Sequence, residues 1–189
     1  MKFNAGRTDA TNTDPVTIAA LAARPADVTV SGLWSVLTPD ERRRGLALSL
    51  GEDRDVRRTL VTLLRKTPRY RSFRPTAFSS WSAEQFADAL KAPGLLTPDV
   101  MQAALIALHV QDRAGMLAAF LDAVAVPHRD GLITDAVESL PVTEEQLLRA
   151  ADDLATRFPR EQVTLYFLTL LVLDPALWGG LAGWLTRQA

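Results

Sequence analysis

The chain contains no cysteine, and this absence removes several classes of protein at once. Disulfides, thiolate metal sites and cysteine nucleophiles are all excluded, and with them a disulfide-stapled secreted scaffold. Histidine is almost as scarce, with two residues among 189. Charge of one sign is not in excess either, because 21 Lys and Arg residues stand against 22 Asp and Glu residues. The net charge of −1 excludes a polyanionic chain.

Long uninterrupted apolar runs are also missing. The most apolar stretch, residues 163–186, is divided by Asp174 and Pro175, whereas a membrane span needs about 20 continuous apolar residues. A charge and a helix-breaking proline in mid-run favour two buried helices joined by a turn. The polar first 14 residues lack the apolar segment of a signal peptide. We therefore expect no membrane segment, a cytoplasmic location, a flexible tail over residues 1–13 and one domain over residues 14–189.

Strand patterns are rare, and the helical period dominates. Leu60, Leu63 and Leu64 recur at helical spacing, and the segment Thr38-Pro39-Asp40-Glu41 has the form of a capping box at a helix start. We interpret Asp130-Gly131 as preceding a helical pattern and not as a hairpin turn. The sequence therefore predicts an all-α fold of some ten helices. The predicted core residues are Leu46, Leu60, Leu64, Leu105, Phe120, Leu121, Leu148 and Leu170.

Part of the sequence recurs at an offset of 59 residues. Leu37-Thr38-Pro39-Asp40 returns as Leu96-Thr97-Pro98-Asp99, and Asp53-Arg54 returns as Asp112-Arg113. Each unit would hold two helices, a proline-bearing loop with a short helix, and a longer helix. We interpret the fold as a compact bundle or short solenoid-like stack of two related units of about 60 residues each, plus a truncated third. Helix capping alone is the alternative explanation of a recurring Thr-Pro-Asp.

No catalytic constellation is found in the sequence. There is no glycine-rich phosphate loop, and His109 and His128 lie 19 residues apart without the further ligands that zinc requires. His109 is interpreted as a satisfied helix residue on an apolar face, and His128, in a loop, is expected to be exposed. We expect no catalytic residue, no cofactor and no metal site. A small helical enzyme with a site assembled from distant residues remains an alternative.

The placement of charge is more informative than the net charge. Residues 1–91 hold 15 basic and 10 acidic residues, whereas residues 92–189 hold 6 and 12. Residues 65–74, which we call the basic loop, combine five basic and two aromatic residues with no acidic one. The corresponding loop of the second unit, 127–130, is nearly neutral. We predict that a partner is bound by Arg65, Lys66, Arg69, Tyr70, Arg71, Phe73 and Arg74.

Three kinds of partner fit the basic loop. We favour an acidic protein, or the acidic half of a second copy of the chain, because opposite charges steer association. Nucleic acid is the first alternative, since basic and aromatic side chains together can contact phosphates and stack on bases. A merely solvated surface is the remaining one.

The second unusual feature is the apolar end of the chain. Apolar residues occupy nearly every face of the last two helices, and a helix that is apolar all round is buried on all sides. We predict that this hairpin docks on a partner or a second copy, with Trp178 and Trp184 as anchors, and keep the core of the domain as the alternative. The two features together predict a non-catalytic protein–protein interaction module, such as an adaptor, scaffold or assembly subunit.

Overall fold

The computed structural model describes residues 16–52, 54–90 and 95–189. Most of these residues are helical, which confirms the predicted all-α class. The longer helices are α3 (Pro39–Glu52), α4 (Arg54–Lys66), α6 (Pro98–Asp112), α7 (Ala114–Ala123), α8 (Glu144–Arg157) and α9 (Arg160–Leu173). The shorter ones are α1 (Ile18–Ala22), α2 (Val30–Val36), α5 (Ala83–Ala89), α10 (Pro175–Trp178) and α11 (Ala182–Thr186), with the 3-10 helices η1 (Pro25–Asp27), η2 (Pro75–Phe78) and η3 (Gly179–Leu181). The tail expected over residues 1–13 lies outside the described residues.

Side-chain caps fix where several helices begin. At α3 the Thr38 hydroxyl accepts the N–H of Glu41 at 3.2 Å, and the Glu41 carboxylate accepts the N–H of Thr38 at 3.0 Å. This confirms the predicted capping box. Ser82 and Gln85 form the same arrangement at α5, and another stands at the start of α8. Each box satisfies N–H groups that have no partner within the helix, so these helix starts are determined locally.

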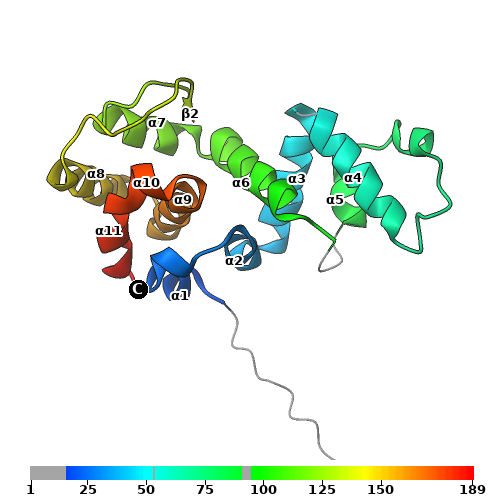
Figure 1. Cartoon of the computed structure of the whole chain (residues 1–189), viewed down its shortest axis with the longest axis horizontal. Helices are drawn as coiled ribbons and strands as arrows, with labels where there is room; N and C mark the ends of the chain where they lie inside the picture. Colours follow the sequence, from blue (N-terminus) through cyan, green and yellow to red (C-terminus); the bar gives the residue numbers. More distant parts are fainter. Residues whose placement is uncertain (1–15, 53, 91–94) are drawn as a thin grey trace, which may run out of the picture.

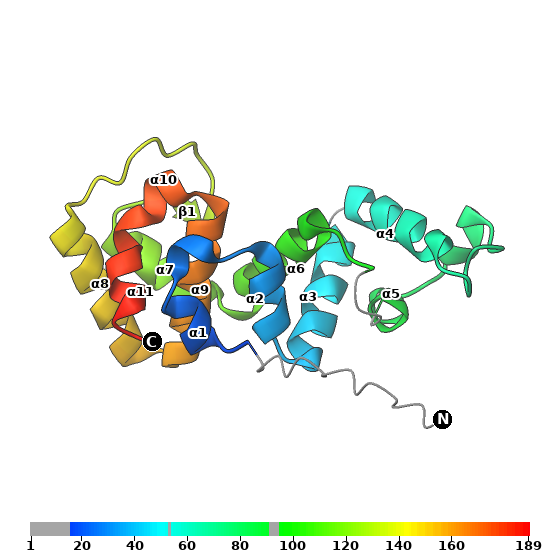
Figure 2. The same cartoon turned by 60° about the horizontal axis from the view of Figure 1, so that its bottom comes forward.

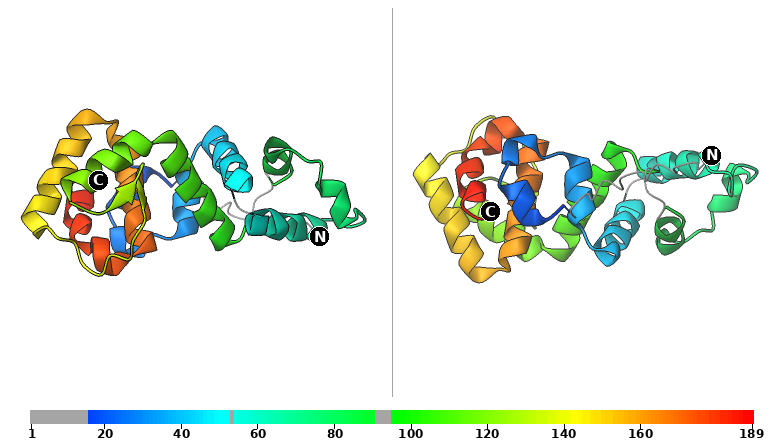
Figure 3. Two further views of the ribbon diagram at one scale, coloured as in Figure 1. Left: turned by 90° about the horizontal axis from the view of Figure 1, so that it is seen from above. Right: turned by 90° about the horizontal axis from the view of Figure 1, so that it is seen from below.

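The helices form an elongated body with a lobe at each end (Figures 1 and 3). The small lobe is residues 54–90, with α4, α5 and the loop between them, and the large lobe contains α1 and α7 to α11. Between the lobes α3 packs against α6, and α3 also packs along α5. A Cβ at Gly45 of α3 would lie 2.7 Å from the carbonyl oxygen of Ala104 on α6. Gly45 therefore permits the close approach of the two helices that join the lobes.

Helix α9 is the centre of the large lobe (Figure 2). Helices α1, α2, α8, α10 and α11 pack against it, and every residue from Val163 to Leu171 is buried. Asp174 ends the run, and its side chain accepts the N–H of Leu177 at 2.9 Å to start α10. Within the described residues no single helix has the length and apolar composition of a membrane span; α6 and α7 reach it only together, with an 87° bend between them.

The hydrophobic core is one continuous cluster of buried side chains. Seven of the eight predicted core residues are buried: Leu46, Leu60, Leu64, Leu105, Phe120, Leu121 and Leu170. The eighth, Leu148, is half-buried and packs against the core from α8. Helical spacing alone therefore identified the side of each helix that faces inward.

A short β-hairpin contradicts the interpretation of Asp130-Gly131. Strands β1 (His128–Arg129) and β2 (Leu132–Ile133) pair antiparallel around these two residues. Asp130 and Gly131 have φ angles of 53° and 86°, the left-handed values that a two-residue type I′ turn requires. The prediction of a helical pattern after these residues was wrong because Asp-Gly is itself a strong hairpin signal, even between strands of two residues.

The order of helices recurs along the chain, but a stack of equivalent units is not confirmed. Helices α3 and α6 begin at Pro39 and Pro98, at the predicted offset. Their surroundings differ, because α3 packs along α5 whereas the principal neighbours of α6 are α2, α3 and α7, and not α8. The loop of the first unit carries η2, and that of the second carries the β-hairpin. The recurring residues thus mark helix starts, while other side chains determine the packing.

Candidate interaction site

The basic loop, residues 65–74, follows a course set by consecutive tight turns. It begins in the last turn of α4, where Arg65 and Lys66 lie at the end of the helix whose dipole favours cations. The N–H groups of Thr67, Tyr70 and Phe73 then each donate to the carbonyl three residues earlier, at 2.9, 3.2 and 3.0 Å. Three backbone N–H groups of the loop are therefore satisfied by carbonyls of the loop or of the end of α4, and the five charged side chains are exposed.

Five aromatic side chains form the core of the small lobe: Tyr70, Phe73, Phe78, Trp81 and Phe86. The ring centroid of Tyr70 lies 5.5 Å from those of Phe73 and Trp81, in edge-to-face contacts. Phe78 and Phe86 are fully buried, whereas Phe73 is 39% exposed. Tyr70 is only 8% exposed, so its ring belongs mainly to the core and not to the predicted contact surface. The loop folds around this ring, which explains why it is covered.

Arg57 of α4 binds the backbone of residues 78–81, which follow the basic loop. Its guanidinium donates to the carbonyl oxygens of Phe78 at 3.2 Å, Ser79 at 3.4 Å and Trp81 at 2.7 Å. The same group lies over the ring of Phe86, 5.0 Å from its centroid. The positive charge of Arg57 is thus used inside the lobe to hold η2 and the turn after it.

Other arginines that precede the loop also have partners within the chain. Those of α3 contact three different helices: Arg42 donates to the carbonyl of Ser35 in α2 (2.9 Å), Arg43 pairs with Asp88 in α5 (3.4 Å), and Arg44 pairs with Asp112 in α6 (2.6 Å). On α4, Arg58 pairs with Asp55. Much of the basic stretch between Arg42 and Arg74 is therefore structural.

The five cations of the basic loop differ from these. Arg65, Lys66, Arg69, Arg71 and Arg74 are exposed, and none is paired with a carboxylate in the part of the chain that the structure describes. The small lobe holds 8 basic and 3 acidic residues, whereas residues 95–189 hold 6 and 12. Positive charge is therefore concentrated at one end of the elongated body.

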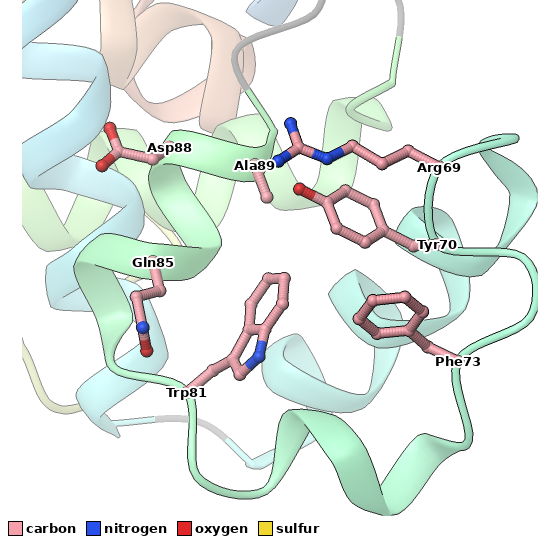
Figure 4. A pocket seen from close by; sticks show the side chains of 7 residues that line it. All are labelled: Arg69, Tyr70, Phe73, Trp81, Gln85, Asp88 and Ala89. Atoms are coloured by element: carbon pink, nitrogen blue, oxygen red, sulfur yellow. The ribbon is translucent and has the colours of Figure 1, made fainter.

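A pocket of about 420 Å³ lies between the basic loop and α5 (Figure 4). Tyr70, Phe73 and Trp81 supply its aromatic surface, and α5 supplies the remaining wall: Gln85, Asp88 and Ala89. The side chain of Arg69 extends across the pocket toward Ala89, with its guanidinium 5.2 Å from the ring centroid of Tyr70. The structure thus places a cation and partly exposed rings around a single hollow.

The two tryptophans of the chain end are not available to a partner. Trp178 is 2% exposed and Trp184 is fully buried, so a docking surface anchored by them is contradicted. The Trp184 ring packs edge to face on Phe167 of α9, and its indole N–H donates to the Asp152 carboxylate of α8 at 2.7 Å. The core interpretation is the correct one, because Trp184 contacts both α8 and α9, and the ring centroid of Trp178 lies 5.9 Å from that of Phe120 on α7.

His109 belongs to a buried polar network between α9, α6 and the start of α3. The Thr169 hydroxyl donates to the Leu165 carbonyl at 2.8 Å and so accepts from Nε2–H of His109 at 3.1 Å. Nδ1 of His109 then accepts from Arg113 at 3.2 Å, and Arg113 pairs with Glu41 at 2.7 Å. Burial first, and the charge of Arg113 second, lower the pKa of His109 to about 3. The interpretation of His109 as a satisfied helix residue is confirmed.

His128 was expected to be exposed, and this prediction is wrong. Its side chain is 12% exposed because Nδ1 accepts the N–H of Gly131 at 3.2 Å, while Nε2 faces the Asp122 carboxylate at 3.1 Å. The histidine thus stabilises the hairpin turn. Among the described residues no group of three His, Asp or Glu side chains is placed to hold a metal ion.

Sequence reasoning missed Trp81 and the residues of α5 that complete the pocket. A signal was present, since five of the thirteen aromatic residues fall between positions 70 and 86. Such a local density indicates a small aromatic core, and it could have linked Trp81 to the basic loop. The α5 wall gives no comparable signal, because Gln85 and Ala89 are ordinary helix residues.

The comparisons with known proteins add no identification to this geometry. No protein-family model matches the chain, and neither a curated protein nor a solved structure matches it.

Proposed function

We propose that the protein is a non-catalytic interaction module, an adaptor, scaffold or assembly subunit, that binds an acidic protein surface through the basic loop. The observation that carries this proposal is the difference between two sets of cations. The arginines of α3 and Arg57 contact carboxylates or carbonyls of the chain itself, whereas the five cations of the loop are exposed without a carboxylate partner in the described residues.

Nucleic acid is the second candidate, and the exposed ring of Phe73 among these cations favours it. Two features make it the weaker one. Glu84 lies in the first turn of α5, and a hydrogen bond from Ser82 lowers the pKa of its carboxyl, so that it stays charged. Residues 95–189 add six further net negative charges. A phosphate backbone lying along the body would be repelled, whereas a short acidic contact at the loop would not.

Two triple variants test the proposal. Arg69→Ala, Arg71→Ala and Arg74→Ala together remove loop charge, and the control combines Arg24→Ala, Arg129→Ala and Arg187→Ala, which are exposed and outside the small lobe. Each chain is used for affinity capture from the native host and for titration with short single- and double-stranded oligonucleotides at about 50 and 200 mM salt. We expect an acidic protein to be retained by the wild type and the control but lost by the loop variant.

Two results would contradict the proposal. Oligonucleotide binding that falls steeply with salt and disappears in the loop variant would establish nucleic acid as the partner. Capture of the same proteins by all three chains would show that the basic loop contacts nothing.

A further inference from the structure

The pocket of the small lobe combines exposed aromatic surface with a buried aromatic interior. Phe78 and Phe86 are fully buried and fill the interior of the cluster, while Phe73 is 39% exposed and Trp81 is half-buried at its edge. Four large apolar side chains of the described residues are exposed: Val16, Phe73, Leu132 and Leu173. Among these, Phe73 alone lines the open pocket of about 420 Å³ between the basic loop and α5.

The polar groups around this pocket offer donors and few free acceptors. The hydroxyl of Tyr70 and the indole N–H of Trp81 have no hydrogen-bond partner among the described residues. Every fully buried side-chain oxygen or nitrogen of these residues has a partner, so the Tyr70 and Trp81 groups must be accessible to solvent. Arg69 adds a guanidinium above the Tyr70 ring. The acceptors are already in use: Gln85 Oε1 accepts the N–H of Ser82 at 2.7 Å, and Asp88 pairs with Arg43.

We propose that this pocket receives one aromatic side chain from an acidic segment of the partner protein. The ring lies against Phe73 and Trp81, and carboxylates on either side of it in the segment pair with Arg69, Arg71 and Arg74. This inference rests on the proposed function, because it names what the acidic partner inserts. Charge complementarity selects this occupant, since an acidic segment meets five cations whose charge nothing in the loop neutralises.

A cationic guest is the less suitable occupant of the same rings. Aromatic side chains also bind trimethylated lysine, because the faces of the rings attract positive charge. Here the guanidinium of Arg69 already lies over the Tyr70 ring, and the carboxylate of Asp88 pairs with Arg43. A cation entering the pocket would meet like charge on one side and no available carboxylate on the other.

Direct binding of labelled peptides tests the proposal. The probe is an eleven-residue fluorescein-labelled peptide of alternating Asp and Glu with one central Trp, and its matched control carries Ala at the centre. Fluorescence anisotropy at about 50 mM salt should give a Kd about tenfold lower for the Trp peptide than for the Ala peptide, the effect of burying one large apolar side chain. Decathymidylate and a lysine-trimethylated peptide serve as competing probes.

Variants of the chain assign the effect to the pocket. Phe73→Ser should reduce the tenfold preference for Trp to nearly one and leave binding of the Ala peptide unchanged. Leu132→Ser is the matched control, since Leu132 is 50% exposed and lies in the hairpin of the large lobe. Ala89→Phe, which fills the pocket from α5 without altering the aromatic cluster, should have the same effect as Phe73→Ser and covers the case in which that variant does not fold.

Each other outcome overturns the inference in a distinguishable way. Equal binding of the Trp and Ala peptides, lost in the Arg69, Arg71 and Arg74 variant, would refute the pocket and leave the proposed function intact. Tighter binding of decathymidylate than of either peptide would refute both. Preference for the trimethylated peptide, or absence of all binding, would refute the acidic aromatic segment. A solution mass above that of one chain would indicate self-association. If Phe73→Ser and Leu132→Ser both lowered that mass, a second copy of the chain would be the occupant of the pocket.

Discussion

Acidification should destabilise the folded chain through one buried side chain, that of His109. Burial, followed by the charge of Arg113, lowers its pKa to about 3, whereas a histidine in an unfolded chain has a pKa of about 6.5. The unfolded state therefore binds the proton more readily than the folded state. The stability that neutral His109 contributes is complete above about pH 6.5 and is lost progressively as the pH falls from 6.5 toward 3.

The magnitude follows from these two pKa values. At pH 7.5 His109 is neutral in both states and contributes almost no pH dependence. A pH of 5 lies about 1.5 units below the pKa of His109 in the unfolded chain. At this pH the unfolded chain has taken up the proton and the folded chain has not. At about 1.4 kcal/mol for each unit, the free energy of unfolding should fall by about 2 kcal/mol between pH 7.5 and pH 5 through this residue alone.

Urea unfolding of the wild type and of His109→Gln at pH 7.5 and 5 isolates this contribution. Glutamine cannot be protonated, and its amide can still donate toward Thr169 or accept from Arg113. Every other titrating group is common to both proteins, so the difference between their two pH effects belongs to His109. We expect the wild type to lose about 2 kcal/mol more than the variant on acidification. Equal losses would show that His109 is not buried in its neutral form.

Three further substitutions test contacts that shape the molecule, all by urea unfolding. Gly45→Ala should lower the free energy of unfolding by about 1–3 kcal/mol, because the new Cβ would lie 2.7 Å from the Ala104 carbonyl oxygen. At Gly115 a Cβ would meet nothing within 4 Å, so Gly115→Ala should instead stabilise α7 by up to about 1 kcal/mol. Equal effects of the two substitutions would refute the close contact at Gly45. Arg57→Ala should cost about 1.5–3 kcal/mol, since it removes the donor to three carbonyls, and a neutral result would mean that η2 holds its place unaided. Trp184→Phe should cost about 1–3 kcal/mol through lost volume and the lost bond to Asp152, an effect that an exposed docking residue would not show.

The parts of the fold that the sequence predicted are those decided within a few residues. The capping box of Thr38 and Glu41 requires only a three-residue spacing, and the inward side of α4 follows from the period of Leu60 and Leu64. His109 could be recognised as a buried residue because its neighbours along the helix are apolar. In each case the pattern and the contact that explains it lie on the same helix.

The candidate site could be predicted only in part, because it depends on which charges find a distant partner. Arg43 and Arg69 are the same residue type in the same basic stretch, yet Asp88 neutralises the first and no carboxylate of the described chain neutralises the second. That distinction requires knowing that α5 packs along α3. The burial of Trp184 was predicted wrongly for a related reason. The sequence of an apolar helix is the same whether that helix packs against α8 of its own chain or against another protein.

The closure of α1 over α9 also determines the order in which the molecule can be completed during its synthesis. The large lobe is discontinuous in the chain, because α1 packs on a helix that follows it by about 140 residues, with the whole small lobe between them. At ribosomal rates of about 5–20 residues per second, α1 waits roughly 7–30 s for its neighbour. The aromatic cluster of the small lobe spans only positions 70 to 86 and has no such delay. The nascent chain should therefore present a folded small lobe while the apolar faces of α1 and α2 still await α9.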